Sequence, residues 1–210
     1  MSADLKNWEI TVEGVTAEDM KDLAKKAGAY GLSIGSLLGN FINDLVDGQA
    51  TNGSDERMYA RQWFDRCWFG MFPEETFLHY LVEWGSLEEV LEAWRGIQTA
   101  EVLIADTEKA IKTGVMQTCD GQPYTWKEIV TRDPETDTEA QAYSSREEWE
   151  ASEREYIEQE QDEIAAYKEV LARCWEEYTE QGKGDYTPGT FDEEMKKVLE
   201  WAEKNQRFLR

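Results

Sequence analysis

The sequence predicts a mainly α-helical protein, with a small N-terminal unit, an aromatic-rich helical core and a long antiparallel helical hairpin. Three observations support this fold class. Apolar residues recur at helical spacing, serine and threonine stand where helices should begin, and two stretches, 86–114 and 145–182, are long enough to pair along their length. Because hydrophobic residues make up 40% of the chain and 9 of its residues are Trp, a folded core is expected rather than disorder.

The N-terminal unit is predicted to contain one strand and two helices. In WEITVEGV, apolar and polar residues alternate from Trp8 to Glu13, as in a short β-strand. Thr16 is placed to cap the first helix. Ser33 is placed to cap the second helix, which carries the sequence GLSIGSLLGNFINDLV and is closed by Gly48.

This order of elements over residues 8–48, with its capping serine, resembles the ribbon-helix-helix family of small dimeric repressors. In that family two chains pair their strands into an antiparallel ribbon, so the resemblance implies a homodimer. It also implies that the outward residues of the strand contact bases, and these match Glu9, Thr11 and Glu13. The backbone amides that follow Ser33 could hold a phosphate.

Glutamates on the ribbon argue against DNA binding, because they would face a dense field of phosphates without compensating arginine or lysine. The sequence therefore predicts that residues 1–50 form a dimerisation module. A DNA-binding transcriptional regulator or accessory factor is the alternative. Residues 49–54, QATNGS, are typical of a turn or linker. A second, acidic helical domain is predicted over residues 54–210.

Aromatic residues are concentrated at the start of this second domain. Ser54 is predicted to cap one helix there, and Pro73 to open the next. Such density is typical of a packed core, and an exposed aromatic binding patch is the alternative. The residues concerned are Tyr59, Trp63, Phe64, Trp68, Phe69, Phe72, Phe77, Tyr80 and Trp84.

The rest of the domain is predicted to be a pair of long helices with short elements between and after them. Ser86 begins the first long helix, and Ser145 begins the second, whose apolar residues have coiled-coil spacing. Thr125 and Glu128 have the spacing of a capping box for a short helix between the two. An amphipathic helix, FDEEMKKVLEWAEKNQRFLR, is predicted at the C-terminal end.

The sequence offers little for catalysis, and no catalytic, metal-binding or cofactor-binding residues are predicted. His79 is the one histidine and stands among apolar neighbours, where a packed histidine is more common than a catalytic one. Nucleotide-binding, zinc-protease and EF-hand motifs are absent from the sequence. Cys67, Cys119 and Cys174 are odd in number and far apart, which indicates reduced thiols rather than a zinc site. The protein is therefore predicted not to be an enzyme.

Acidity is the strongest compositional feature. The chain has 45 Asp and Glu against 22 Lys and Arg, a formal net charge of −23, which repels nucleic acid and anionic membranes and favours basic proteins. Residues 133–163 hold 13 of the carboxylates against Arg146 and Arg154. A solvated helix face is the mundane interpretation of such a run. The predicted partner-binding residues are Glu147, Glu150, Glu153, Glu155, Glu158 and Asp162.

In charge and architecture the chain resembles acidic helical inhibitors from phages and mobile elements, including some anti-CRISPR proteins. Together with the dimer implied by the ribbon-helix-helix resemblance and the concentrated acidic helix, this leads to the hypothesis of a homodimeric DNA mimic that blocks a basic nucleic-acid-binding host protein, with a CRISPR effector as one candidate. A scaffold with a purely structural role is a further alternative. MSADLKNWEI contains no apolar signal core, and no stretch approaches the roughly 20 apolar residues of a membrane-spanning helix. The expected location is the bacterial cytoplasm.

Overall fold

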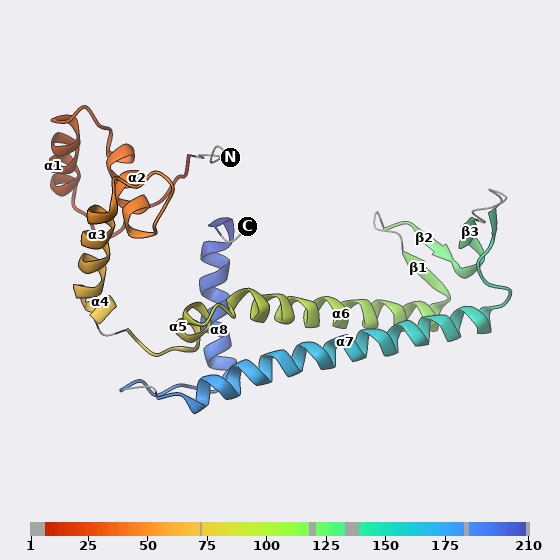
Figure 1. Cartoon of the computed structure of the whole chain (residues 1–210). Coiled ribbons are helices and arrows are strands. Elements are labelled where there is room, and N and C mark those ends of the chain that lie inside the picture. The colour runs from red at the N-terminus through yellow and green to blue at the C-terminus, as the bar shows by residue number, and fades with distance from the viewer. Residues whose placement is uncertain (1–6, 72, 118–120, 133–138, 183–184, 209–210) are drawn as a thin grey trace. The chain divides into compact units, whose positions relative to one another are not determined.

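The computed structural model describes residues 7–71, 73–117, 121–132, 139–182 and 185–208 (Figure 1). It is mainly helical, as predicted. The chain divides into two compact units between Glu74 and Glu75. The predicted domain boundary, between residues 50 and 54, lies inside the first of these units. No helix in the described parts of the chain is long and apolar enough to cross a membrane.

The described residues of the first unit form the helices α1 (Ala17–Gly28), α2 (Ile34–Leu45), α3 (Ser54–Arg66) and α4 (Trp68–Met71). Two predicted caps are confirmed. The Thr16 side chain accepts a hydrogen bond from the backbone N–H of Asp19 (3.1 Å), and Ser33 accepts one from Ser36 (3.0 Å). Ser54 is not a cap, because Gly53 occupies that position and Ser54 is the first residue of α3.

The predicted strand near Trp8 is not observed in this single chain. Residues 7–16 lie in neither a helix nor a strand, and the first helix begins at Ala17. A two-stranded ribbon needs a second strand, which the ribbon-helix-helix family takes from a second chain. The ribbon-helix-helix resemblance therefore stays a prediction.

The first unit has a small interior. Its described residues include only three buried ones, Ala27, Asp44 and Ala60. The Asp44 carboxylate accepts hydrogen bonds from the Thr51 hydroxyl (2.7 Å) and from the backbone and side-chain nitrogens of Asn52 (2.8 Å each). The bonds from Asn52 and then Thr51 lower the pKa of Asp44. These contacts tie the α2–α3 loop to α2.

The second unit is built on an antiparallel helical hairpin (Figure 1). Its helices are α5 (Phe77–Glu83), α6 (Leu87–Thr113), α7 (Arg146–Glu180) and α8 (Phe191–Asn205). Gly96 of α6 lies against Tyr167 of α7, and further along, the Arg146 guanidinium donates to the carbonyl of Ile111 (3.0 Å). These pairs run in opposite directions along the two helices. The predicted hairpin is therefore present.

Two small β-hairpins stand at the far end of α6 and α7, and neither was predicted. Strand β1 (Val115–Gln117) pairs antiparallel with β2 (Pro123–Thr125), and β3 (Val130–Arg132) pairs antiparallel with β4 (Glu139–Gln141). Between them lies a short 3-10 helix, η1 (Trp126–Glu128), whose capping box of Thr125 and Glu128 is confirmed. A second, η2 (Gln206–Phe208), follows α8.

The main hydrophobic core lies at the other end of the hairpin, where α5 and α8 pack against α6 and α7. The predicted start at Pro73 is wrong, since Thr76 caps α5 through the N–H of His79 (3.1 Å) and the helix begins at Phe77. Its buried residues are Phe77, Tyr80, Leu81, Leu87, Val90, Leu91, Ala93, Leu171, Cys174, Tyr178, Met195, Val198 and Ala202.

The predicted aromatic core divides into two groups. Phe77 and Tyr80 are buried in the second unit, where the ring of Phe77 lies 5.2 Å from that of Tyr178. The aromatic residues of α3 and α4 remain exposed, and so does Trp84; Phe72 lies outside the described residues. The packing interpretation therefore holds for part of this stretch only.

A buried carboxylate, Glu194, joins three segments of the second unit. Its Oε1 atom accepts hydrogen bonds from Lys197 (2.5 Å), Tyr186 (2.6 Å) and the backbone of Gly189 (3.4 Å), and Oε2 accepts one from the backbone of Phe77 (3.2 Å). Burial raises the pKa of Glu194, but these donors outweigh that effect and the net shift of the pKa is downward. The carboxylate thus fastens α8 to the start of α5.

Candidate functional site

The candidate site is the outward side of α7. Ser145 caps this helix by accepting a hydrogen bond from the backbone N–H of Glu148 (3.2 Å), as predicted. Its inward side is marked by the buried Trp149 near the beginning and the buried Leu171 and Tyr178 near the end. The opposite side of α7 faces solvent over the whole length of the helix.

Four of the six predicted partner-binding residues share this outward side. Glu147, Glu155, Glu158 and Asp162 are all exposed. With about 100° of rotation per residue, they fall within a sector of about 80°, centred opposite the buried positions. None of the four forms an ion pair with the residues that the structure describes.

The other two predicted residues point elsewhere. Glu150 has a side chain that is 21% exposed and is paired with Arg146 (2.8 Å) and Arg154 (3.0 Å). The hydrogen bond from Arg146 is the largest of the effects that lower its pKa. Glu153 is half-buried and accepts a hydrogen bond from the indole N–H of Trp149 (2.8 Å). These two carboxylates are thus largely satisfied within the helix.

The outward sector also contains carboxylates that sequence reasoning missed. Glu169, Glu176 and Glu180 continue it to the end of α7, and all three are exposed. The signal was available, because the coiled-coil spacing fixes the inward side and these three residues fall opposite it. We call the complete set the acidic row: Glu147, Glu155, Glu158, Asp162, Glu169, Glu176 and Glu180.

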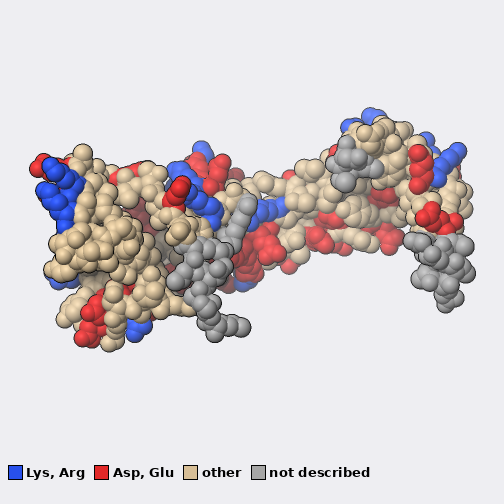
Figure 2. Space-filling model, turned by 90° about the horizontal axis from the view of Figure 1, so that it is seen from above, with Lys and Arg blue, Asp and Glu red and all other residues tan. Residues whose placement is uncertain are grey.

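The acidic row belongs to a helix that is strongly negative as a whole. From Arg146 to Glu180 there are thirteen carboxylates against four basic side chains, a formal net charge of −9. At 1.5 Å per residue this is one carboxylate for roughly 4 Å of helix when all sides of the helix are counted, and about 8 Å along the acidic row, against roughly 3.4 Å of axial rise per phosphate in one DNA strand. Figure 2 shows acidic side chains gathered along one flank of the hairpin.

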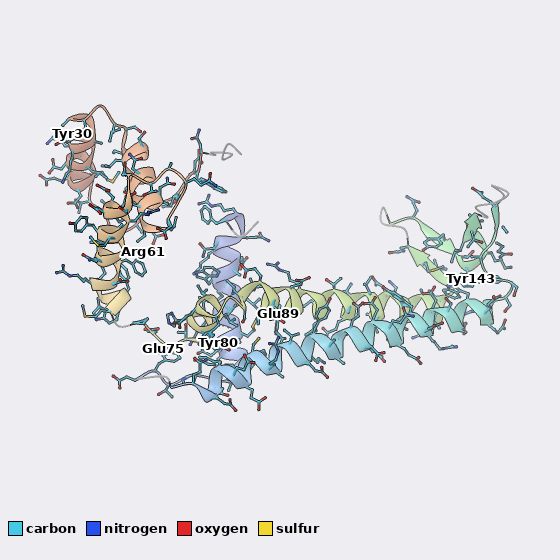
Figure 3. The ribbon with its side chains drawn as sticks, in the orientation of Figure 1. Tyr30, Arg61, Glu75, Tyr80, Glu89 and Tyr143 are labelled. Carbon is cyan, nitrogen blue, oxygen red and sulfur yellow. The ribbon has the colours of Figure 1, made fainter. Side chains whose placement is uncertain are left out.

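Packing against α6 holds this surface in place. Arg173 donates to Glu89 of α6 (2.7 Å), and this ion pair raises the pKa of the Arg173 side chain (Figure 3). A Cβ atom on Gly96 would lie 2.6 Å from Cζ of Tyr167, so the helices approach closely only because that position is glycine. The acidic row is therefore presented by a supported helix rather than by a free one.

The predicted ribbon face belongs to the first unit, whereas the acidic row belongs to the second. Glu9, Thr11 and Glu13 are exposed and belong to no helix or strand. Ser33 is exposed at the start of α2, where its hydroxyl lies 2.9 Å from the hydroxyl of Ser36. Among the residues that the structure describes, no basic side chain forms an ion pair with Glu9 or Glu13.

His79 and the cysteines are the remaining residues that the sequence analysis considered for chemistry. The His79 Nε2 atom lies 3.5 Å from a carboxylate oxygen of Glu83 and 3.9 Å from one of Glu75. No group of three histidine, cysteine or acidic residues in the described ranges has the geometry to hold a metal ion. Cys67 and Cys174 are free thiols, and Cys119 lies outside the described residues.

The chain was compared with protein families, curated proteins and solved structures. No protein-family model, curated protein or solved structure matches the chain.

Proposed function

We propose that the protein is a non-enzymatic binding protein that places the acidic row in the nucleic-acid groove of a basic partner. The main observation in favour of this proposal is the acidic row, in which seven exposed carboxylates lie in one narrow sector of a helix that packs against α6. Basic grooves attract such a surface over distance and at close range. The neighbouring basic residues Arg154 and Arg173 are already engaged by Glu150 and Glu89.

The length of the acidic row supports a partner that binds duplex nucleic acid. A straight row of roughly 50 Å corresponds to about 15 base pairs of duplex at 3.4 Å each. A DNA-binding or RNA-guided protein of a bacterial host, such as a CRISPR effector, has a groove of this kind, and an inhibitor of that type is typical of a phage or mobile element. Cytoplasmic location and a homodimer are part of the same proposal.

Capture from a nuclease-treated bacterial lysate tests this function. The full chain is immobilised beside two triple variants that change the net charge equally. The row variant carries Glu155→Lys, Glu158→Lys and Asp162→Lys. The matched control reverses three exposed carboxylates outside α7, Asp65, Glu74 and Glu203.

The wild-type chain and the control should retain basic nucleic-acid-binding proteins that the row variant loses. Equal capture by both variants would show that total charge, and not the row, determines binding. A DNA-binding regulator is the competing function, and it predicts that the chain shifts duplex DNA in a Thr11- and Ser33-dependent manner. The exposed Glu9 and Glu13 argue against that outcome, because they add negative charge to the predicted ribbon.

A further inference from the structure

The outer side of α3 carries residues that the first unit does not use. Ala60 is buried and marks the inward side of this helix. At about 100° per residue, Asp55, Tyr59, Gln62 and Arg66 fall in a sector about 60° wide that is turned away from Ala60. All four are exposed, and the side chain of Tyr59 is 63% exposed.

Opposite charges stand at the two ends of this outer side. Asp55 lies in the first turn and Arg66 is the last residue, roughly 16 Å apart along the helix. Neither is in an ion pair with any residue that the structure describes. Arg57 and Arg61, on another side of α3, behave differently, because both pair with Asp47.

We propose that α3 pairs antiparallel with α3 of a second copy of the chain across a two-fold axis. In that arrangement Asp55 of each copy faces Arg66 of the other, and Tyr59 of each faces Gln62 of the other. The charge pattern is self-complementary about the middle of the helix, as an isologous interface requires. A partner of another kind would need no such symmetry.

Apolar surface on and beside this side supplies most of the apolar area that a stable contact takes. Trp63 is 51% exposed, and its ring lies 6.2 Å from that of Phe69, which is equally exposed. With Tyr59 and Met58 they offer about 300 to 400 Å² of apolar area, given 150 to 250 Å² for a whole aromatic side chain. A standard interface takes about 800 Å² from each partner, a little over half of it apolar.

A hollow on the same side gives room for the opposing side chains. It has a volume of about 390 Å³ and is lined by Tyr59, Gln62, Trp63, Arg66 and Cys67. The first unit has only three buried residues among those described, so it gains an interior when this surface is covered. The contact is distinct from the ribbon predicted at residues 8–15.

A charge swap in the full chain tests the pairing, with the dimer dissociation constant measured by sedimentation. Asp55→Arg and Arg66→Asp should each weaken the dimer roughly tenfold or more, because each places like charges opposite each other twice. The double variant should restore wild-type affinity. Within one chain the two positions are too far apart to rescue each other, so recovery would identify contact between copies.

Truncation of the exposed ring provides the second measurement. Tyr59→Ala should weaken the dimer at least roughly tenfold. Tyr30→Ala is the matched control, since Tyr30 is 82% exposed in the turn after α1 and should leave the dimer unchanged (Figure 3). Circular dichroism shows whether each variant keeps its helices.

Three results would overturn the proposal. The first is a wild-type chain that is monomeric at every concentration measured. The second is a dimer that none of the α3 variants weakens, as expected for pairing through residues 8–15. The third is a charge-swapped double variant no tighter than the single ones.

Discussion

Replacement of Glu194 by glutamine should destabilise the second unit, although the two side chains have nearly the same shape. Every group around this carboxylate is a donor: the Lys197 ammonium, the Tyr186 hydroxyl, and backbone N–H groups at Gly189 and Phe77. An amide must turn its NH₂ group toward one of the two sets. Whichever way the amide is oriented, its NH₂ group then faces either the backbone N–H of the buried Phe77 or the Lys197 ammonium, so at least one donor loses its acceptor.

The expected loss is about 2 to 4 kcal/mol of unfolding free energy at pH 7. Hydrogen bonds to a charged group contribute about 1.5 to 3 kcal/mol each, and an unsatisfied buried donor costs about 1 to 3 kcal/mol. The Lys197 side chain is half-exposed and can hydrogen-bond water instead, so it contributes little to this loss of unfolding free energy. The backbone N–H of Phe77 has no such outlet, because Phe77 is fully buried.

The stability difference between the wild-type chain and Glu194→Gln should depend on pH. Since the pKa of folded Glu194 is below its ordinary value of 4.5, its contribution is full above pH 4.5 and is lost as the pH falls through the folded pKa. Glutamine does not titrate, so the difference between wild type and Glu194→Gln should shrink in acid. Urea unfolding followed by circular dichroism, with hydrogen exchange over 77–83 and 191–205, measures this. A difference below about 0.5 kcal/mol at pH 7 would refute the reasoning.

Three further predictions concern other contacts. Gly96→Ala should lower the free energy of unfolding by about 1 to 3 kcal/mol, because the added methyl group would overlap the ring of Tyr167. Tyr167→Ala in the same chain should restore part of that loss, as measured by urea unfolding in a double-mutant cycle. Asp44→Asn should speed hydrogen exchange in the α2–α3 loop, because the loop loses its carboxylate acceptor, and should leave exchange in the second unit unchanged. An equal change in both units would contradict the division of the chain into two compact units. Burial and then the bond to Glu177 raise the pKa of Tyr80 to about 12, so Glu177→Gln should lower the pKa of Tyr80, followed by the NMR signal of its own ring, and an unchanged pKa would show that the bond is absent.

Helix starts were predictable from the sequence where a single side chain caps its own helix. Thr16, Ser33 and Ser145 each bond the backbone three residues ahead, so the pattern is local. The start of α5 was missed because both Pro73 and Thr76 suit a helix beginning, and packing of Phe77 favours the second. The β-hairpins were missed because three-residue strands have too little alternation to show a period.

The candidate site was predictable in part. Charge density pointed to α7, but density alone does not separate outward from inward carboxylates, and Glu150 and Glu153 proved to be engaged by neighbours. The spacing of the apolar residues would have placed Glu169 and Glu176 in the row. Glu194 was not predictable, because two of its donors, Phe77 and Tyr186, come from other parts of the chain.

Competition with duplex DNA for a captured basic protein tests the central claim most directly. The measured quantity is the inhibition constant of the full chain against a labelled duplex of about 15 base pairs. The chain should compete fully, and reversal of Glu155, Glu158 and Asp162 should weaken it roughly 100-fold, since three charge pairs at up to about 1 kcal/mol each are lost. Reversal of Asp65, Glu74 and Glu203 should change it little. Equal inhibition by the two variants, or DNA binding unaffected by saturating protein, would contradict the account.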